Sequence, residues 1–264
     1  MRRTRGRARS REEAENPYWI SFSDLMTALL AVFILAVVAL VLQLTEKQEA
    51  LAAEQRTAQE QRSLFSDQIT SLQHAEEVRS DVLVEVASTL QAQGIDVIVS
   101  QDNSVLSIPT ALLGFDSASF EIRPEHRDVA LAIGAAIDDS LRHDERFRYL
   151  DTVFVEGHTD NQSFDGLEGT GNWGLSTFRA ISLWRLWETS LPDDGGLDDL
   201  RRTDGSPLFS VSGYGETRPA TNVQETDIDR AANRRIDVRF TVVRPTAENL
   251  AEILENADAT GQVP

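Results

Sequence analysis

The most apolar part of the chain is an unbroken run near its start. Residues 25–42 form eighteen successive positions without a charge, and Thr27 is the only polar residue among them. With its flanks, this run predicts a helix over residues 18–44, longer than the roughly 20 residues needed to cross a bilayer. Tyr18 and Trp19 lie where aromatic side chains collect at a membrane–water interface. The pattern therefore predicts one transmembrane helix.

The following segment, residues 45–93, contains no Gly or Pro and is rich in residues that favour helix. Apolar residues recur here every seven positions, which indicates a seam for self-association. The companion positions are mostly polar, which argues against a long coiled coil. Two interpretations stay open, a dimerising or gating segment and a plain helical linker. The residues at spacing seven are Leu44, Leu51, Ala58, Phe65 and Leu72.

From residue 94 to residue 244 the pattern changes to short strands that alternate with helices. Alternation of apolar and polar residues predicts strands, and helical periodicity predicts two helices between them. This order is typical of one sheet with helices on a face, so the predicted class for the chain is α+β. Residues 245–264 are predicted to form a C-terminal tail with a short helix. The expected strands are 95–99, 105–108, 152–156, 209–213 and 235–243, and the expected helices are 124–141 and 175–189.

The distribution of charge adds a direction to the membrane helix. Residues 1–16 hold six arginines against three glutamates. The positive-inside rule therefore places an N-terminal segment, residues 1–17, in the cytoplasm and the domain after the helix in the periplasm. A cleaved signal peptide is disfavoured, because its apolar region runs only about 7–15 residues and ends at small residues. The formal net charge of −18 argues against a nucleic-acid partner.

Candidate metal and thiol chemistry is absent from the sequence. The chain has no cysteine, which excludes disulfides, thiol catalysis and Cys-rich zinc sites. Its histidines are scattered and predict neither a zinc site nor a catalytic triad. We therefore expect no metal and no enzymatic turnover. The four histidines are His74, His126, His143 and His158.

Asp24 is the anomaly of the apolar segment. A carboxylate that faces lipid costs at least about 2.5–3.5 kcal/mol, so such a residue normally faces protein or water and serves a function. On a helix, Asp24 shares one face with Thr27, Ala28 and Ala31. Small residues beside a carboxylate suit close contact with partner helices. The alternative is that Asp24 merely lies near the interface, about 8 Å along the helix axis from Trp19.

A second pair of charges stands in the later domain. Asp160 is expected at the end of a strand, and Arg179 in the first turn or so of a helix. Together they could present an anion and a cation to one zwitterionic ligand through charge-assisted hydrogen bonds. The alternative is a simple ion pair between the two side chains.

Four separated motifs give this domain a resemblance. They are GHTD at 157–160, NWGLSTFRA at 172–180, GYGE at 213–216 and NRRIDV at 233–238. In this order they resemble the C-terminal domain of the OmpA/MotB family, an α/β sandwich that binds peptidoglycan. The resemblance implies that an Asp binds the ammonium, and an Arg the carboxylate, of diaminopimelate in the stem peptide. The implied site residues are Asp160, Arg179, Asn172, Leu175, Thr159, Phe115 and Asp116.

The first helix resembles the ion-motive branch of the same superfamily. The stretch WISFSDLMTALLAVF, which begins at Trp19, is similar to the membrane helix of MotB-type stator subunits. The resemblance implies that Asp24 carries protons in a path shared with a MotA-like partner. It also implies a homodimer and no cofactor beyond the proton as coupling ion.

Within this family, the sequence is most similar to the MotB-like subunits of Zorya anti-phage systems, whose partner is a ZorA-like protein. The features behind this choice are the PYWIS entry to the helix, the short N-terminus and the stretch PLFSVSGYGETRPAT. The expected function is that of a proton-driven motor subunit in the inner membrane. A flagellar stator subunit and a passive membrane-anchored tether remain as alternatives.

Overall fold

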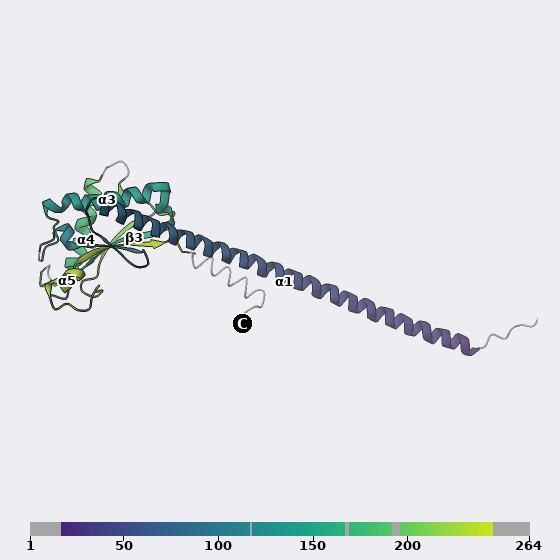
Figure 1. The fold of residues 1–264 in the computed structure, drawn as a ribbon. Helices are drawn as coiled ribbons and strands as arrows, with labels where there is room; N and C mark the ends of the chain where they lie inside the picture. Colours follow the sequence, from purple (N-terminus) through teal and green to yellow (C-terminus); the bar gives the residue numbers. More distant parts are fainter. Residues whose placement is uncertain (1–16, 117, 167–168, 192–195, 245–264) are drawn as a thin grey trace, which may run out of the picture. The chain divides into compact units, whose positions relative to one another are not determined.

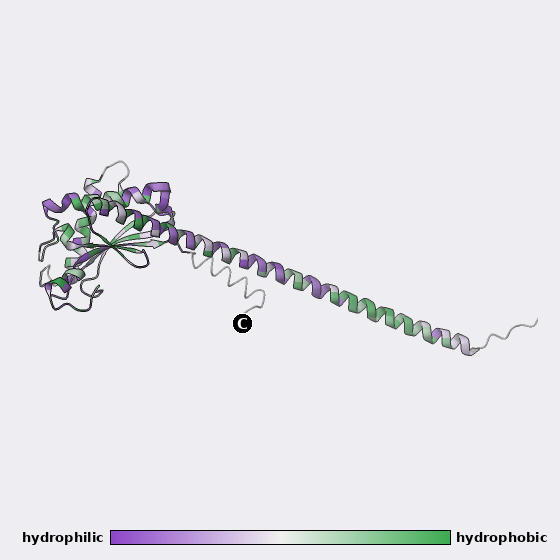
Figure 2. Cartoon of the chain, in the orientation of Figure 1, coloured by the Kyte–Doolittle hydropathy of each residue, from purple (hydrophilic) through white to green (hydrophobic). Residues whose placement is uncertain are grey.

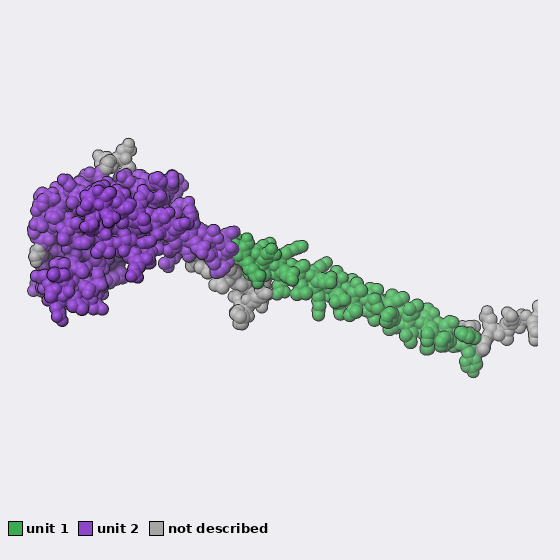
Figure 3. Space-filling model, in the orientation of Figure 1, with its two compact units in different colours: residues 1–64, 260–264 green, residues 65–259 purple. Residues whose placement is uncertain are grey.

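The computed structural model of the chain describes residues 17–116, 118–166, 169–191 and 196–244. The predicted basic segment before residue 17 and the predicted tail after residue 244 lie outside these ranges. The chain divides into two compact units, Met1–Leu64 with Thr260–Pro264 and Phe65–Ala259 (Figure 3).

The long helix α1 runs from Pro17 to Ala92. Its part up to Leu64 is the described part of the first unit, and the rest of α1 belongs to the second unit. Pro17 is its first residue, a position where a helix tolerates proline because no N–H partner is lost. Hydrophobic residues fill an uninterrupted stretch in the N-terminal half of α1 (Figure 2). The described side chains from Tyr18 to Leu44 are all exposed. By length and composition, α1 is a helix that can cross a membrane.

The C-terminal end of α1 belongs to the core of the second unit. Leu83, Val86 and Leu90 are fully buried there, at the spacing of one helix face. Ser140 Oγ donates a hydrogen bond to the carbonyl oxygen of Val82 at 3.4 Å. By contrast, Leu44, Leu51 and Phe65, from the predicted seam, are exposed. The stretch predicted as one helical linker, residues 45–93, therefore has two environments.

The second unit contains a mixed sheet of five strands in the order β1-β2-β5-β3-β4 (Figure 1). Neighbouring strands are antiparallel except for β3 and β4, which are parallel. The chain therefore has the α+β fold predicted for it: a long apolar N-terminal helix, a helical region and a mixed-sheet domain. The strands are β1 (Ile98–Val99), β2 (Val105–Pro109), β3 (Leu150–His158), β4 (Phe209–Gly213) and β5 (Arg235–Val242).

Two long helices and several short ones complete this unit. Helices α3 and α4 pack against each other, and α4 packs on β3 and β4. The indole Nε1–H of Trp187 in α4 donates to the carbonyl oxygen of Ala130 in α3 at 2.7 Å. The helices are α2 (Thr110–Leu113), α3 (Arg127–Arg142), α4 (Gly171–Ser190) and α5 (Asp227–Asn233), with 3-10 turns η1 (Pro124–His126), η2 (His143–Tyr149) and η3 (Leu197–Asp199).

The structure departs from the predicted elements mainly where polar residues are involved. Strand β3 extends to His158, beyond the predicted end at residue 156, because its last residues are buried although they are polar. Helix α4 begins at Gly171, four residues before the predicted start, in a turn with two glycines that carry no helical signal. Helix α5 was not predicted, since it is short and polar. A capping box between Thr226 and Asp229 starts it.

The two faces of β5 show how the sheet is built. Ile236, Val238 and Phe240 are buried on the face that packs against the helices. Arg235, Asp237 and Arg239 alternate with them and point to the opposite face, as the period of two requires. This opposite face carries a network of charges described below.

A zwitterionic pocket at the end of strand β3

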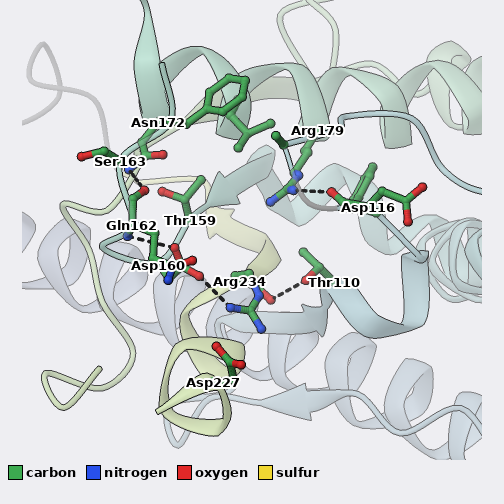
Figure 4. A pocket seen from close by; sticks show the side chains of 14 residues that line it. Thr110, Asp116, Thr159, Asp160, Gln162, Ser163, Asn172, Arg179, Asp227 and Arg234 are labelled. Carbon is green, nitrogen blue, oxygen red and sulfur yellow. Dashed lines mark hydrogen bonds and ion pairs between the residues drawn. The ribbon is translucent and has the colours of Figure 1, made fainter. Parts of the chain in front are cut away.

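A cavity of about 450 Å³ opens at the end of β3 in the second unit (Figure 4). Its walls come from the loop after α2, the two residues that follow β3, the first turns of α4 and the region of α5. All seven residues implied by the family resemblance line this one cavity, although they lie in separate parts of the sequence. They are Phe115, Asp116, Thr159, Asp160, Asn172, Leu175 and Arg179.

Close contact between β3 and α4 sets the position of the cavity. A Cβ on Gly157 would lie only 1.9 Å from the carbonyl oxygen of Ser176, so only glycine fits there. Ser176 Oγ accepts a hydrogen bond from the N–H of Gly215 at 2.9 Å. The N–H of Thr159 donates to the carbonyl oxygen of Gly215, also at 2.9 Å. Three of the four motifs thus meet at this point.

A buried ion pair on the far face of the sheet anchors the end of β3. Glu156 is only 3% exposed, and the guanidinium of Arg239 donates to both of its carboxylate oxygens. The hydroxyl of Tyr214 donates to Glu156 Oε1 at 3.1 Å. A buried charge is tolerated when such partners satisfy it. The strand end that leads into the cavity is therefore held on both faces.

A second polar cluster lies beside the first. His158 Nε2 is 3.2 Å from Asp237 Oδ2, and Arg235 Nε donates to both oxygens of the same carboxylate at 3.0 Å. Ser107 Oγ donates to Asp237 Oδ1 at 2.6 Å. Burial alone would raise the pKa of Asp237, but the interactions with His158, Arg235 and Ser107 outweigh it and lower that pKa.

Asp160 is the carboxylate of the cavity and is only 6% exposed. Its Oδ1 accepts from the N–H of Gln162 at 3.1 Å. Its Oδ2 accepts from Nη1 of Arg234 at 2.6 Å. The sequence left open an ion pair between Asp160 and Arg179. Among the described residues, the cation paired with Asp160 is Arg234 instead.

Arg179 is the buried cation of the cavity and is only 5% exposed. Nε donates to the carbonyl oxygen of Ser119 at 2.8 Å, and Nη2 donates to that of Asp116 at 3.1 Å. Its Cζ lies 5.3 Å from the centroid of the Phe115 ring, within cation–π range. Burial lowers the pKa of Arg179 to about 10, although Asp160 opposes this shift. The sequence predicted Arg179 in the first turn or so of a helix. Because α4 already starts at Gly171, Arg179 lies in its third turn.

The remaining predicted residues contribute in different ways. Asn172 Nδ2 donates to the carbonyl oxygen of Gln162 at 2.9 Å and so ties the loop to α4. Thr159 Oγ1 is buried and has no hydrogen-bond partner in the described structure. Asp116 serves Arg179 through its backbone carbonyl, while its own carboxylate is exposed. Leu175 supplies an apolar wall.

Sequence reasoning missed two charged residues of the cavity, Arg234 and Asp227. Arg234 stands inside the NRRIDV motif, so a signal for it existed, but the motif does not reveal which of its two arginines faces the cavity. Asp227 is the first residue of α5, which carried no apolar pattern. The charged lining is therefore three aspartates and two arginines: Asp116, Asp160, Asp227, Arg179 and Arg234.

Asp24, the other predicted site residue, lies on α1 in the first unit and is exposed. Thr27, on the same face, donates its hydroxyl to the carbonyl oxygen of Ser23 at 2.7 Å. No partner for Asp24 occurs in the described part of the chain.

Comparisons with known proteins match segments in both units of the chain. Residues 2–53 match the family model described as membrane MotB of the proton-channel complex MotA/MotB. Motility protein B of Bacillus subtilis (strain 168) is 34% identical over 86 residues, which is 33% of this chain and 28% of that protein. Zorya protein ZorB of Escherichia coli O139:H28 is 22% identical over 235 residues, which is 88% of this chain and 83% of that protein.

The chain is therefore similar to MotB in its N-terminal segment and to ZorB over most of its length. A MotB-like protein from Desulfovibrio vulgaris of known structure has a TM-score of 0.48 and 19% identity, and covers 65% of this chain and 99% of its own. The chain spans little more than a quarter of the Bacillus subtilis relative, so the similarity to that protein concerns one segment.

Proposed function

We propose that this protein is the peptidoglycan-anchored stator subunit of a proton-driven motor in the bacterial inner membrane, and that it acts in Zorya anti-phage defence. The single observation that carries the wall-binding part is the cavity that holds a buried carboxylate, Asp160, together with a buried guanidinium, Arg179. The similarity to ZorB over most of the chain supports the role in defence.

The chemistry of the cavity matches a zwitterionic ligand such as the free end of diaminopimelate in the stem peptide. Arg179 meets only backbone carbonyls and an aromatic ring among the described residues, so a ligand carboxylate would supply its missing counter-charge. Asp160 would accept the ligand ammonium. Phe115 and Leu175 would enclose the aliphatic part between the two charged groups.

The motor part of the proposal rests on Asp24. In a bilayer, an ionised Asp24 is costly unless a partner or water solvates it, and protonation removes that cost. Each change of protonation would therefore change which contact with a MotA-like, ZorA-like partner is favoured. The basic segment before the helix supports a cytoplasmic N-terminus and a periplasmic second unit. A homodimer would place two such helices in one partner ring.

The motor part and the wall-binding part of the proposal can be tested separately, with two substitutions in the full chain co-expressed with its MotA-like partner. Asp24→Asn should abolish protection against phage, while membrane levels and co-sedimentation with purified sacculi stay unchanged. Asp67→Asn, on an exposed polar stretch of the same helix, is the matched control and should protect normally. Full protection by Asp24→Asn would contradict the proton role and leave a passive tether.

Asp160→Asn should instead abolish co-sedimentation with sacculi that contain diaminopimelate. Asp96→Asn, at an exposed position outside the cavity, serves as its control. Release of soluble fragments from the sacculi would indicate an enzyme and overturn the proposal.

The flagellar alternative is favoured by one observation, the 34% identity to Motility protein B over 86 residues. Restoration of swimming to a strain that lacks its flagellar stator, without any effect on phage, would favour that alternative over defence.

A further inference from the structure

Arg234 occupies the carboxylate that the proposed ligand needs. Its Nη1 lies 2.6 Å from Asp160 Oδ2, and the other oxygen of Asp160 already accepts the N–H of Gln162. Arg179 differs, because among the described residues its charge meets no carboxylate within ion-pair distance. Among the described residues, the cavity therefore presents a cation without a carboxylate partner and a carboxylate that is already paired.

The backbone of Arg234 is fixed while its side chain is not enclosed. Its carbonyl oxygen accepts from both the N–H and the hydroxyl of Thr110, at 3.0 and 3.1 Å. Its side chain is 32% exposed, against 9% for that of Asp160. A guanidinium on such a fixed base can rotate without moving α5 or β5.

A second acceptor for this guanidinium lies on the same cavity. Asp227 lines it, and its side chain is 86% exposed. Arg230 already pairs with one oxygen of Asp227 at 2.6 Å, and the charge of Arg234 also contributes to the lowered pKa of this carboxyl. Figure 4 shows Arg234 between Asp160 and Asp227.

We propose that Arg234 is an internal counter-ion that masks Asp160 in the empty cavity and moves to Asp227 when a ligand ammonium binds. The proposal rests on the proposed zwitterionic ligand and adds how its site is regulated. Binding of the ammonium then exchanges one ion pair for another, so Asp160 is never left buried without a cation. This exchange also makes the cavity selective for ligands with an ammonium group, because a ligand without one cannot replace Arg234 at Asp160.

The physical consequence is that Arg234 weakens binding. When a ligand must first displace a competing group, its apparent affinity is the intrinsic affinity multiplied by the fraction of sites from which that group is absent. Arg234→Gln removes the competitor and keeps the backbone contacts with Thr110. We expect the full chain, purified in detergent, to bind diaminopimelate-containing sacculi about 3- to 10-fold more tightly after this change.

The design includes matched variants. Arg202→Gln removes an arginine of similar exposure, 30%, that pairs with Asp151 outside the cavity, and should leave binding unchanged. Arg234→Lys keeps the charge and should bind like the unmodified chain. Arg234→Met provides a second neutral variant if the glutamine variant unfolds at a lower temperature.

Two further experiments test whether Arg234 exchanges Asp160 for Asp227. Acetylation of the free amines on the sacculi removes the ammonium, so the gain from Arg234→Gln should disappear. Asp227→Asn should weaken binding about 2- to 3-fold in the unmodified chain and have no effect in the Arg234→Gln chain, because it acts only through Arg234.

The outcomes separate this inference from the proposed function. If the unmodified chain does not bind sacculi, the proposed ligand is wrong. If it binds, and both neutral variants at position 234 bind equally well or more weakly, Arg234 is not a competitor and the inference is overturned.

Discussion

The two candidate sites of this protein differ in what surrounds their carboxylate. Asp160 is 6% exposed and has two hydrogen-bond donors from its own chain. Asp24 is exposed, and so are the described side chains around it on α1, from Tyr18 to Leu44. The first candidate site is built from residues of one chain, whereas the second, in the proposed function, would need lipid and partner helices to become a site. A self-contained site depends on the stability of its unit, and an incomplete one on assembly.

The largest expected effect tests how strongly the second unit, which holds the pocket, depends on the close contact between β3 and α4. Gly157→Ala places a methyl group against the carbonyl oxygen of Ser176, a backbone atom that cannot move away easily. We expect a loss of about 3 kcal/mol or more in the free energy of unfolding of the second unit. Thermal unfolding followed by circular dichroism measures it.

Gly94→Ala provides the control for this change. Gly94 has a positive φ of +77°, which Gly157 does not, and no atom lies within 4 Å of its added Cβ. Only backbone strain of about 1–2 kcal/mol is expected there. A loss at Gly157 no larger than the loss at Gly94 would contradict a tight contact between β3 and α4 at this position.

The next effect separates binding from stability within the pocket. Arg179→Gln removes the buried guanidinium and should weaken binding to sacculi about 10- to 100-fold. The change removes the hydrogen bonds to the carbonyl oxygens of Ser119 and Asp116, but it also removes the cost of burying a charge, which lowers the pKa of Arg179 to about 10. The two effects oppose each other, so the unfolding temperature should change little. Arg185→Gln, at an exposed position of the same helix, should bind normally. A large loss of stability in Arg179→Gln would mean that Arg179 is needed for folding.

A third change tests the incomplete site. Ala28 lies on the face of Asp24, and Ala28→Leu should reduce co-purification of a MotA-like partner about 10-fold by blocking close helix contact. It should leave unfolding of the second unit unchanged, because residue 28 lies in the first unit. Ala36 lies about 120° around the helix from Asp24, and Ala36→Leu is the matched control. Equal losses for both variants would contradict a specific helix face.

The smallest effect concerns pH and the charge network under β3. The pKa of Asp237 is lowered in the folded state, so its ionised form contributes stability above its ordinary pKa of about 3.9. That contribution is lost as the pH falls below this value towards the folded pKa. Asp237→Asn should therefore lower the free energy of unfolding at neutral pH and make the acid unfolding less steep below about pH 4. Unchanged acid unfolding would show that other carboxylates control it.

Several features could be predicted because they are local in the sequence. The apolar run, the strands β2, β4 and β5 and the seven cavity residues each follow from contiguous patterns or short motifs. Polar segments gave weaker signals: α5 has no apolar stripe, and β3 ends in buried polar residues whose partners come from β5 and from Tyr214. Hydrophobic periodicity cannot report on such segments, because charge partners and not apolar contacts hold them.

The amino-acid sequence by itself determined that one helix is apolar enough to cross a membrane, that Asp24 interrupts it, and that Asp160 and Arg179 belong to one motif set. Only the tertiary structure decided that Asp160 pairs with Arg234, 74 residues away, and that the end of α1 packs in the core. The physical reason is that local propensity and hydrophobicity act along a segment, whereas the partner of a buried charge is chosen by the folded sheet and the loops that close over it.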